Sequence, residues 1–459
     1  MTFQPNSPHA RDVRYHLHPY TNLKAHEEQG PLIIERGEGV YVFDDSGKRY
    51  LEGLAGLWCT GLGFSEERLA KAAYEQMRKL PYAHSFAHRS HPAVIDLAEK
   101  LISLAPDSIS KVFFTNSGSE ANDTQVKIVR YYNNVRGRPE KKKIIARKGS
   151  YHGITLASAS LTGLAYAHKF FDLPLDGFLH TEAPHPYHGA EPGESEEDYA
   201  SRLAQMLDDM IVAEGPDTVA AFIAEPVMGA GGVMPPPATY FEKIQAVLKK
   251  HDVLFIADEV ICGFGRTGNM FACETYGLKP DMLTVAKQLS SGYLPIAGAM
   301  VSDEIYQVLK EGSAEAGTFG TGYTYTGHPV SAAVALETLN IYQERDIVGH
   351  VRAVMGRFQE RLMALGEHPL VGEARGVGLI GAVELVEDKA GKRNFDAARK
   401  IGARAAQLCQ EEGVLLRPLA NDTVAACPPL IIEPAQVEEL FDGFTRGLDR
   451  LAGELGVAV

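Results

Sequence analysis

The middle of the chain alternates short apolar runs with longer segments of helical periodicity. Several of these runs, such as VAAFIA and VLFIA, are continuously apolar, which indicates strands buried on both faces. Strands joined by helices in this way predict an α/β fold with a mostly parallel sheet between helices. We expect strands at 111–116, 143–147, 219–226, 253–260, 283–287 and 297–302, and helices at 120–135 and 238–250.

The two ends of the chain show different patterns. Residues 1–56 contain short β-rich runs that are broken by glycines and by an Asp-Asp-Ser-Gly turn, which is typical of a small meander. Residues 326–459 combine helices and strands in the manner of an α+β domain. Helices are expected there at 329–343, 396–412 and 434–453, and strands at 379–386 and 414–419. The sequence thus divides into zones 1–56, 57–325 and 326–459.

Charge and cysteine content exclude several classes of protein. The 459 residues include 45 Lys and Arg against 59 Asp and Glu, and this net charge of −14 counts against nucleic acid or an anionic membrane as the main partner. The N-terminus lacks the apolar core of a signal peptide. The most apolar long stretch carries Glu225 and several prolines, so we do not expect it to span a membrane. The cysteines are odd in number and widely spaced, so we expect no disulfides and a cytoplasmic location. They are Cys59, Cys262, Cys273, Cys409 and Cys427.

A serine- and glycine-rich turn joins a predicted buried strand to a predicted helix. In the segment TNSGSEAND, Ser117, Gly118 and Ser119 lie at the expected helix N-terminus. Such a terminus has unpaired N–H donors and a favourable dipole, so it suits a phosphate. Taken alone, the segment is more simply interpreted as an ordinary N-cap turn, because serine often caps helices.

The segment GFGRTG, at 263–268, formally matches a dinucleotide-binding fingerprint. Its context is poor, because two residues separate it from the preceding strand and no convincing helix follows. We therefore predict a loop here, and a nicotinamide-linked dehydrogenase ranks as an alternative that rests on this segment alone.

A carboxylate and a lysine occur at the ends of two predicted strands. Asp258 and Glu259 follow an apolar strand, at the edge of an open α/β sheet where ligands bind. Lys287 ends the run LTVAK. Desolvation there would lower the pKa of the lysine and favour a neutral, nucleophilic amine. A solvated strand end or an Asp–Lys ion pair is the simpler reading of these two residues.

Taken together, these features suit one cofactor. Pyridoxal phosphate needs a phosphate site, an aromatic face for its ring, a carboxylate for its pyridine nitrogen and a lysine for its aldehyde. The sequence offers the turn at 117–119, the pair Tyr151 and His152 after the next strand, Asp258 and Lys287.

The ordered motifs resemble those of class III aminotransferases, the ω-transaminases of the fold-type I pyridoxal-phosphate superfamily. The similarity covers nearly the whole chain and is closest to the amine, diamine or β-alanine:pyruvate branch. The resemblance implies a large cofactor-binding domain at 57–325 and a smaller α+β domain made from both ends. The motifs are HLHPYT, GLAGLWCTGLGF, FFTNSGSEAND, YHG, AFIAEPVMGAGG, ADEVICGFGRTG, AKQLSSGYLP, GYTYTGHP, HPLVGEARGVGL and LLRP.

The resemblance also implies roles for single residues. Lys287 would be the Schiff-base lysine and move the proton during catalysis, and Asp258 would pair with the pyridinium nitrogen. Tyr151 would stack on one face of the ring and Val260 would pack on the other. Glu225 would orient the cofactor. The phosphate would be held by Ser117, Gly118 and Ser119, and by Thr324 of a neighbouring subunit, which implies a homodimer and leaves a tetramer open.

The substrate pocket implied by the resemblance contains Trp58, Phe86, Tyr151 and Arg417, although aromatic residues of this kind often serve plain core packing. Arg417 would clasp a substrate carboxylate, because its fork matches a carboxylate bidentately. The implied reaction is a ping-pong transfer of an amino group from an amine, a diamine or an ω-amino acid to pyruvate.

Alternatives and departures from the family pattern complete the sequence-based hypothesis. An aminomutase or a decarboxylase of the same family would share the lysine and the aspartate, and a non-catalytic assembly protein would not need them. The histidines of HPYH, at 185–188, lack a ligand partner at recognised spacing, so we expect surface-loop histidines and no metal. Met228 stands where many relatives have glutamine and Gln288 where many have glycine, which leaves the fine geometry open.

Overall fold

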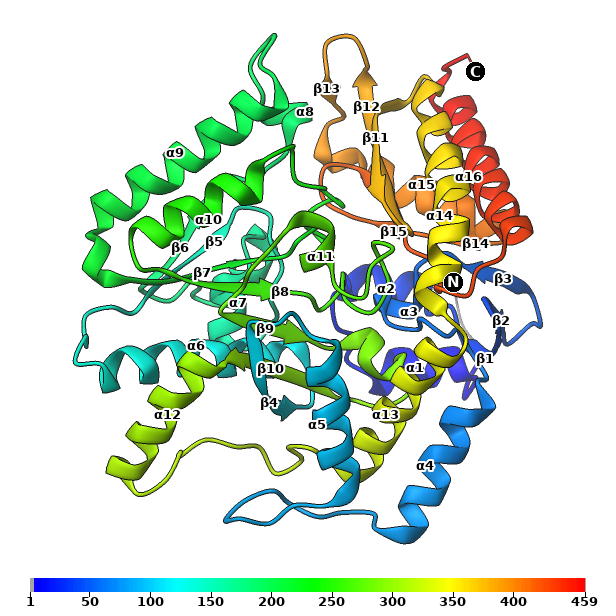
Figure 1. Ribbon diagram of the computed structural model, residues 1–459. Coiled ribbons are helices and arrows are strands. Elements are labelled where there is room, and N and C mark those ends of the chain that lie inside the picture. The colour runs from blue at the N-terminus through cyan, green and yellow to red at the C-terminus, as the bar shows by residue number, and fades with distance from the viewer. Residues whose placement is uncertain (1–3, 459) are drawn as a thin grey trace.

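A seven-stranded sheet forms the centre of the molecule (Figure 1). The computed structural model describes residues 4–458. The strand β10 runs antiparallel to both of its neighbours, and the remaining pairs are parallel, which confirms the predicted mostly parallel sheet. In sheet order the strands are β4 (Ile109–Thr115), β10 (Ala297–Ser302), β9 (Met282–Val285), β8 (Leu254–Asp258), β7 (Val219–Ala224), β5 (Lys143–Arg147) and β6 (Phe178–Thr181).

Both faces of this sheet are apolar and covered by helices. In β8, Ile256 packs into the cluster on one face while Phe255 and Ala257 pack into the cluster on the other. This explains the continuous apolar runs in the sequence, because neighbouring strand residues point to opposite faces. One face is covered by α6 (Gly118–Val135), α7 (Leu156–Leu161) and α12 (Asp303–Ala316), and the other by α5 (Pro92–Leu104), α9 (Glu196–Glu214), α10 (Tyr240–Lys250) and α13 (Pro329–Glu344).

The two ends of the chain meet in smaller sheets. The meander predicted near the N-terminus is present, and its last strand pairs in parallel with β14 from the C-terminal part. The first small sheet has the order β1 (Ile34–Glu38), β2 (Tyr41–Asp44), β3 (Arg49–Glu52) and β14 (Val414–Leu415). The second has the order β11 (Val371–Val377), β12 (Ile380–Asp388), β16 (Thr423–Ala426) and β15 (Arg417–Pro418), and β13 (Arg393–Asn394) pairs with β12.

The structure corrects three predicted boundaries. The strand expected at 414–419 is split into β14 and β15, which belong to different sheets. The helix expected at 396–412 begins only at residue 401, after a separate turn of 3-10 helix. The strand expected at 283–287 ends at Val285, so Lys287 lies in the following turn. The limits of the domains stay a prediction.

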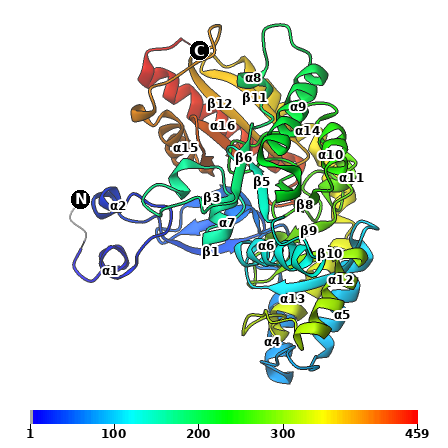
Figure 2. The same cartoon turned by 90° about the vertical axis from the view of Figure 1, so that its left-hand side faces the viewer.

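The remaining helices lie around this framework. The α1 and α2 helices project from the body of the molecule (Figure 2), and no residue of either helix is buried. Within residues 4–458, no helix combines the length and apolar character needed to cross a bilayer. All five cysteines are free thiols, as expected. The helices outside the two layers that cover the central sheet are α1 (Pro8–Tyr15), α2 (Leu23–Gln29), α3 (Ala55–Trp58), α4 (Glu67–Lys79), α8 (Pro186–Gly189), α11 (Ala272–Tyr276), α14 (Ile347–Ala364), α15 (Ile401–Glu411) and α16 (Pro434–Leu455).

Candidate active site

A cavity of about 320 Å³ lies beyond the C-terminal ends of the parallel strands. This is the edge at which open α/β sheets bind ligands. The cavity brings together nine of the residues singled out from the sequence, although they come from five separate segments of the chain. They are Ser117, Gly118, Ser119, Tyr151, His152, Glu225, Asp258, Val260 and Lys287.

The phosphate site predicted at the start of α6 opens into this cavity. Ser117 is the N-cap of the helix, and its Oγ accepts a hydrogen bond from the N–H of Glu120 at 3.2 Å. The N–H groups of the first helical turn, at Gly118 and Ser119, have no helical acceptor, as at any helix N-terminus. A side chain at Gly118 would approach Val260 to 3.3 Å. The turn therefore presents donors to the cavity and keeps space in front of them.

Asp258 is held in one orientation by three donors. Its Oδ2 accepts a hydrogen bond from Asn122 Nδ2 at 2.8 Å and lies 2.8 Å from His152 Nδ1. Its Oδ1 accepts from the N–H of Val260 at 3.2 Å. The carboxylate is buried at the end of β8, which is costly unless it is well solvated by such donors. His152 thus orients the Asp258 carboxylate. The sequence alone offers His152, with Tyr151, as an aromatic face for the cofactor ring.

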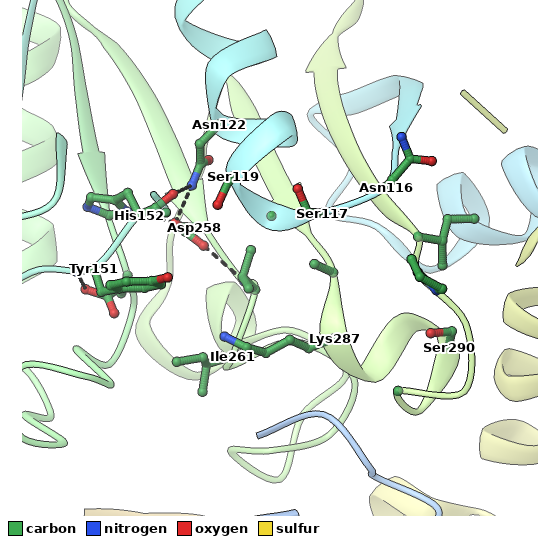
Figure 3. Close-up of a pocket in the computed structure, with 18 of the residues that line it drawn as sticks. Asn116, Ser117, Ser119, Asn122, Tyr151, His152, Asp258, Ile261, Lys287 and Ser290 are labelled. Carbon is green, nitrogen blue, oxygen red and sulfur yellow. Dashed lines mark hydrogen bonds and ion pairs between the residues drawn. The ribbon is translucent and has the colours of Figure 1, made fainter. Parts of the chain in front are cut away.

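Lys287 reaches into the cavity from the turn after β9. Figure 3 shows its side chain extended with the nitrogen on the side of Tyr151. Ser117 and Ser119 lie above the lysine in this view. Burial lowers the pKa of the lysine, and the nearby negative charge of Asp258 works in the other direction. The residue has a left-handed φ of 46°, which is strained for a residue other than glycine and is typical of functional sites.

Glu225 fixes the backbone that carries Tyr151. Its Oε2 accepts from the N–H of Tyr151 at 3.2 Å, and its Oε1 accepts from the N–H of Gly229 at 3.0 Å. Arg147 donates to the carbonyl oxygen of Glu225 at 2.5 Å. Burial raises the pKa of the Glu225 carboxyl group. The glutamate therefore orients the aromatic wall of the cavity.

The ring of Trp58 lies close to both the lysine and an arginine. The centre of its ring is 6.0 Å from Lys287 Nζ and 5.8 Å from Arg417 Cζ. Both residues follow Trp58 in the sequence by more than 200 positions, and the arginine comes from the short strand β15. The arrangement places a positively charged guanidinium group and the reactive amine near the same aromatic ring.

Four of the residues expected at the site do not line the cavity of this chain: Trp58 and Arg417, described above, and Phe86 and Thr324. Phe86 is 45% exposed and Thr324 is also exposed. Both belong to neighbouring surface segments, because a side chain at Gly322 would approach the Phe86 ring to 2.7 Å. Thr324 is fixed through its carbonyl oxygen, which accepts from Tyr82 at 2.9 Å.

Sequence reasoning missed several residues at the site. Asn122 bridges Asp258 and the carbonyl oxygen of His152, which accepts from the same amide at 2.7 Å. Its spacing of three from Ser119 on a helix could have revealed it, since such residues share a face. Tyr20, which donates to the Tyr151 hydroxyl at 3.3 Å, gave no local signal.

The two departures from the family pattern have packing roles. The Gln288 side chain is buried, and its Nε2 donates to the carbonyls of Ile261 at 3.2 Å and Gly263 at 3.0 Å. The glutamine therefore fixes the GFGRTG segment, which is a loop as predicted and is followed by the five-residue helix α11. Met228 is buried, with its methyl group near Gly149 and Gly231.

The residues of the cavity fit pyridoxal phosphate. A helix N-terminus, an aromatic wall, a buried carboxylate and a lysine with lowered pKa surround one space. Two buried atoms beside it, Asn122 Oδ1 and His152 Nε2, have no hydrogen-bond partner among the residues that the structure describes.

Comparison with known proteins agrees with this reading. Residues 23–448 match the model of the family described as Aminotransferase class-III. Gamma-aminobutyrate transaminase 1, mitochondrial, from Oryza sativa subsp. indica is 54% identical over 440 residues, which are 95% of this chain and 85% of that protein. The omega transaminase from Pseudomonas jessenii in complex with PMP has a TM-score of 0.97 at 53% identity, covering 99% of this chain and 100% of the other.

Two further solved structures bear on the substrates. A transaminase with L-Ala has a TM-score of 0.91 at 57% identity and covers 92% of this chain and 100% of its own. The PjTA-R6 variant W58M/F86L/R417L, engineered for asymmetric synthesis of enantiopure bulky amines, has a TM-score of 0.97 at 52% identity, covering 98% of this chain and 100% of that chain.

The chain belongs to the class III aminotransferase family. It is a transaminase that depends on pyridoxal phosphate, and the family, fold and cofactor predicted from the sequence are confirmed. The dehydrogenase alternative is set aside, because its motif is an isolated loop without the required strand–turn–helix context.

Proposed function

We propose that the protein transfers the amino group of a primary amine or an ω-amino acid to pyruvate. The observation that carries this proposal is that a reactive amine and a guanidinium group both lie near one aromatic ring: Lys287 Nζ is 6.0 Å and Arg417 Cζ is 5.8 Å from the centre of the Trp58 ring. An apolar amine contacts the ring, and a carboxylate pairs with the arginine. The relatives named for gamma-aminobutyrate and the transaminase with L-Ala support both kinds of substrate.

The residues of the chain divide the work between them. When bound, pyridoxal phosphate supplies an aldehyde that accepts amines and a ring that withdraws electrons. Lys287 Nζ holds the cofactor and then moves a proton, because its burial favours the neutral amine. The Asp258 carboxylate would provide a fixed negative charge to pair with the protonated ring nitrogen of the cofactor. Ser117, Gly118 and Ser119 hold the phosphate.

The experiment that tests the proposal is a panel of amines with pyruvate as acceptor, scored by the alanine formed. Primary amines, putrescine, β-alanine and 4-aminobutyrate are expected to give alanine in amounts that depend on pyruvate. Product formation that does not depend on pyruvate would point to an aminomutase or a decarboxylase and would contradict the proposal.

Replacement of Arg417 by leucine is expected to separate the two substrate classes. The KM values for β-alanine and pyruvate should rise about 30-fold, since a charge-assisted pair contributes about 2 kcal/mol. The rate with an uncharged arylalkyl amine should change little in the half-reaction that converts the cofactor to its amine form. Stopped-flow absorbance of the cofactor measures each half-reaction alone.

The matched control is Arg446→Leu, which removes the same charge from an exposed residue that pairs with Glu412. It should leave both KM values as in the wild type. Equal losses for charged and uncharged donors in Arg417→Leu would show that the arginine does not recognise the carboxylate.

We further propose a homodimer in which Thr324 reaches the phosphate site of the partner. Its exposure outside the cavity of its own chain supports this, as do large exposed apolar side chains nearer the N-terminus, of the kind that protein interfaces cover. They include Leu17 at 77%, Leu156 at 65% and Phe170 at 91% exposed.

Free cysteines support a reducing, cytoplasmic setting for the protein.

Thr324→Ala is expected to weaken binding of pyridoxal phosphate about tenfold, because one hydrogen bond to a charged group is lost. Thr321→Val, three residues earlier, should bind the cofactor normally. At limiting cofactor, mixed dimers of Thr324→Ala and Lys287→Ala should recover activity that neither variant shows alone. A monomer in analytical ultracentrifugation, or no recovery in the mixture, would refute the shared site.

A further inference from the structure

Three histidines surround a single aspartate in the N-terminal segment, apart from the active site. Asp12 Oδ2 lies 2.7 Å from His18 Nε2 and 3.1 Å from His26 Nε2. Asp12 Oδ1 lies 3.3 Å from His16 Nδ1. Burial alone would raise the pKa of the aspartate, but hydrogen bonds from the three histidines hold the pKa below its usual value. One carboxylate therefore contacts three histidine rings, and together they make four potential ligand groups.

The segment that carries this cluster has no apolar core of its own. Asp12 is on α1 and His26 is on α2, while His16 and His18 belong to the connection between the helices. Neither helix has a buried residue, and both project from the body of the molecule (Figure 2). Small units that cannot bury enough apolar surface are commonly held together by disulfides or metal ions. The cluster is the polar connection between the two helices.

The distances in the cluster suit a tetrahedral metal ion. With bonds of about 2.0 Å to imidazole nitrogen and carboxylate oxygen, the ligand atoms of a zinc site lie about 3.3 Å apart. The contacts from Asp12 to its three histidines, at 2.7 to 3.3 Å, already approach this spacing. The ligand atoms of Asp12, His16 and His18 all lie within 4.8 Å of one another. The rings of His18 and His26 have centroids 4.1 Å apart.

We propose that Asp12, His16 and His18 bind one divalent transition-metal ion, with Zn²⁺ as the ion of best fit. His26 lies outside this closely spaced set, but its contact with Asp12 at 3.1 Å makes it the candidate for the fourth ligand. Three imidazoles and one carboxylate match the nitrogen and oxygen preference of zinc, whereas calcium and magnesium require oxygen ligands. Each imidazole keeps its single proton by moving it to the other ring nitrogen when it binds the ion. The ion adds two positive charges beside the one negative charge of the aspartate.

Metal binding at this place would act on the entrance of the active site. Two residues beyond His18, Tyr20 donates a hydrogen bond to the Tyr151 hydroxyl, and its ring packs edge-on against Tyr166 at 5.9 Å. Tying α1 to α2 fixes the segment from which this tyrosine extends. Zinc is therefore expected to order the N-terminal segment over the cavity without taking part in the reaction.

A second histidine cluster is the natural comparison. The expectation of surface histidines in HPYH is wrong for His185, which is buried, whereas His188 is exposed on the short helix α8. Tertiary structure brings both histidines to Glu384. Arg375 already pairs with that glutamate at 3.0 Å. A guanidinium group at the carboxylate opposes a metal cation there, so this cluster serves as a control.

The test uses the full chain loaded with pyridoxal phosphate, without a histidine tag and freed of metal by a chelator. Titration with Zn²⁺ alone, followed by calorimetry, is expected to show one ion bound per chain. Co²⁺ in its place should give the intense visible absorption of four-coordinate cobalt. Zinc should also slow proteolysis within residues 8–29, which is a readout independent of activity.

Variants decide where the ion binds. Asp12→Asn and His18→Gln should each weaken zinc binding at least about tenfold, since even indirect partners of a metal site contribute that much. His188→Gln should bind zinc like the wild type. His16→Gln, at a side chain 60% exposed, repeats the test where misfolding is not a concern. No bound zinc, normal binding by His18→Gln and His16→Gln, or loss of binding in His188→Gln would each overturn the proposal.

Discussion

Replacing Lys287 with alanine is expected to reduce kcat for transamination at least about 10³-fold. A positioned proton-transfer group contributes about 10² to 10⁴-fold, and this lysine is also the amine that holds the cofactor. The lysine lies in the cavity with a pKa lowered by burial, so its neutral form is available for both tasks. Alanine formation from pyruvate measures the loss.

The structure offers a control for the loss of a lysine. Lys249→Ala removes an exposed lysine near the end of α10 and should keep wild-type turnover. After reduction with borohydride, the cofactor should remain on the peptide that contains Lys287 in the wild type and in Lys249→Ala. In Lys287→Ala it should be released on denaturation. Full turnover by Lys287→Ala would refute the mechanism.

Replacing Asp258 with asparagine is expected to lower kcat about 10² to 10⁴-fold. The change keeps the shape of the side chain and removes its charge, which three donors hold toward the cavity. Loss of one partner of a buried charge pair costs about 3 to 5 kcal/mol, and each 1.36 kcal/mol corresponds to a factor of ten in rate. Single-turnover kinetics with saturating cofactor measures the effect on the chemical step.

The neighbouring acid provides the control. Glu259 is also buried, but its oxygens accept from the N–H groups of Ala272 at 3.1 Å and Cys273 at 2.6 Å, and it does not line the cavity. Burial raises the pKa of Glu259 to about 7, so glutamine resembles the form present near neutral pH. Glu259→Gln should keep most of the activity, whereas equal losses in both variants would indicate a merely structural effect.

The Asp258→Asn substitution is also expected to change how cofactor attachment depends on pH. Burial lowers the pKa of Lys287, and the negative charge of Asp258 supports its ammonium form. Removing that charge should lower the pKa of the lysine further. The rate at which the apoenzyme attaches its cofactor falls as the pH is lowered, because the lysine becomes protonated. In Asp258→Asn this fall should occur at a lower pH than in the wild type. An acidic limb that does not move would show that the two groups are not coupled.

The central sheet could be predicted because its signal is local. Each strand of the type seen in β7 is apolar on both faces, and this pattern follows from covering the sheet with helices on both sides. The ends of some strands could not be predicted from the local pattern. Lys287 lies beyond the end of its strand, and the run 414–419 contributes to two different sheets. The direction of the chain at these points depends on packing against distant segments.

The amino-acid sequence by itself determined the alternation of buried strands and helices, the helix N-terminus at Ser117, and the position of Asp258 at the end of a strand, with Lys287 shortly after another. Periodicity, capping and strand-end position are properties of neighbouring residues, so they can be read along the chain.

Only the tertiary structure decided which groups meet. It turned Asp258 toward the cavity and Glu259 away from it, and it brought Arg417 to Trp58. It also placed Glu384 beside His188, a carboxylate that no nearby sequence position supplied. Contacts of this kind join residues far apart in the sequence, and their geometry arises from the path of the whole chain, to which no local pattern responds.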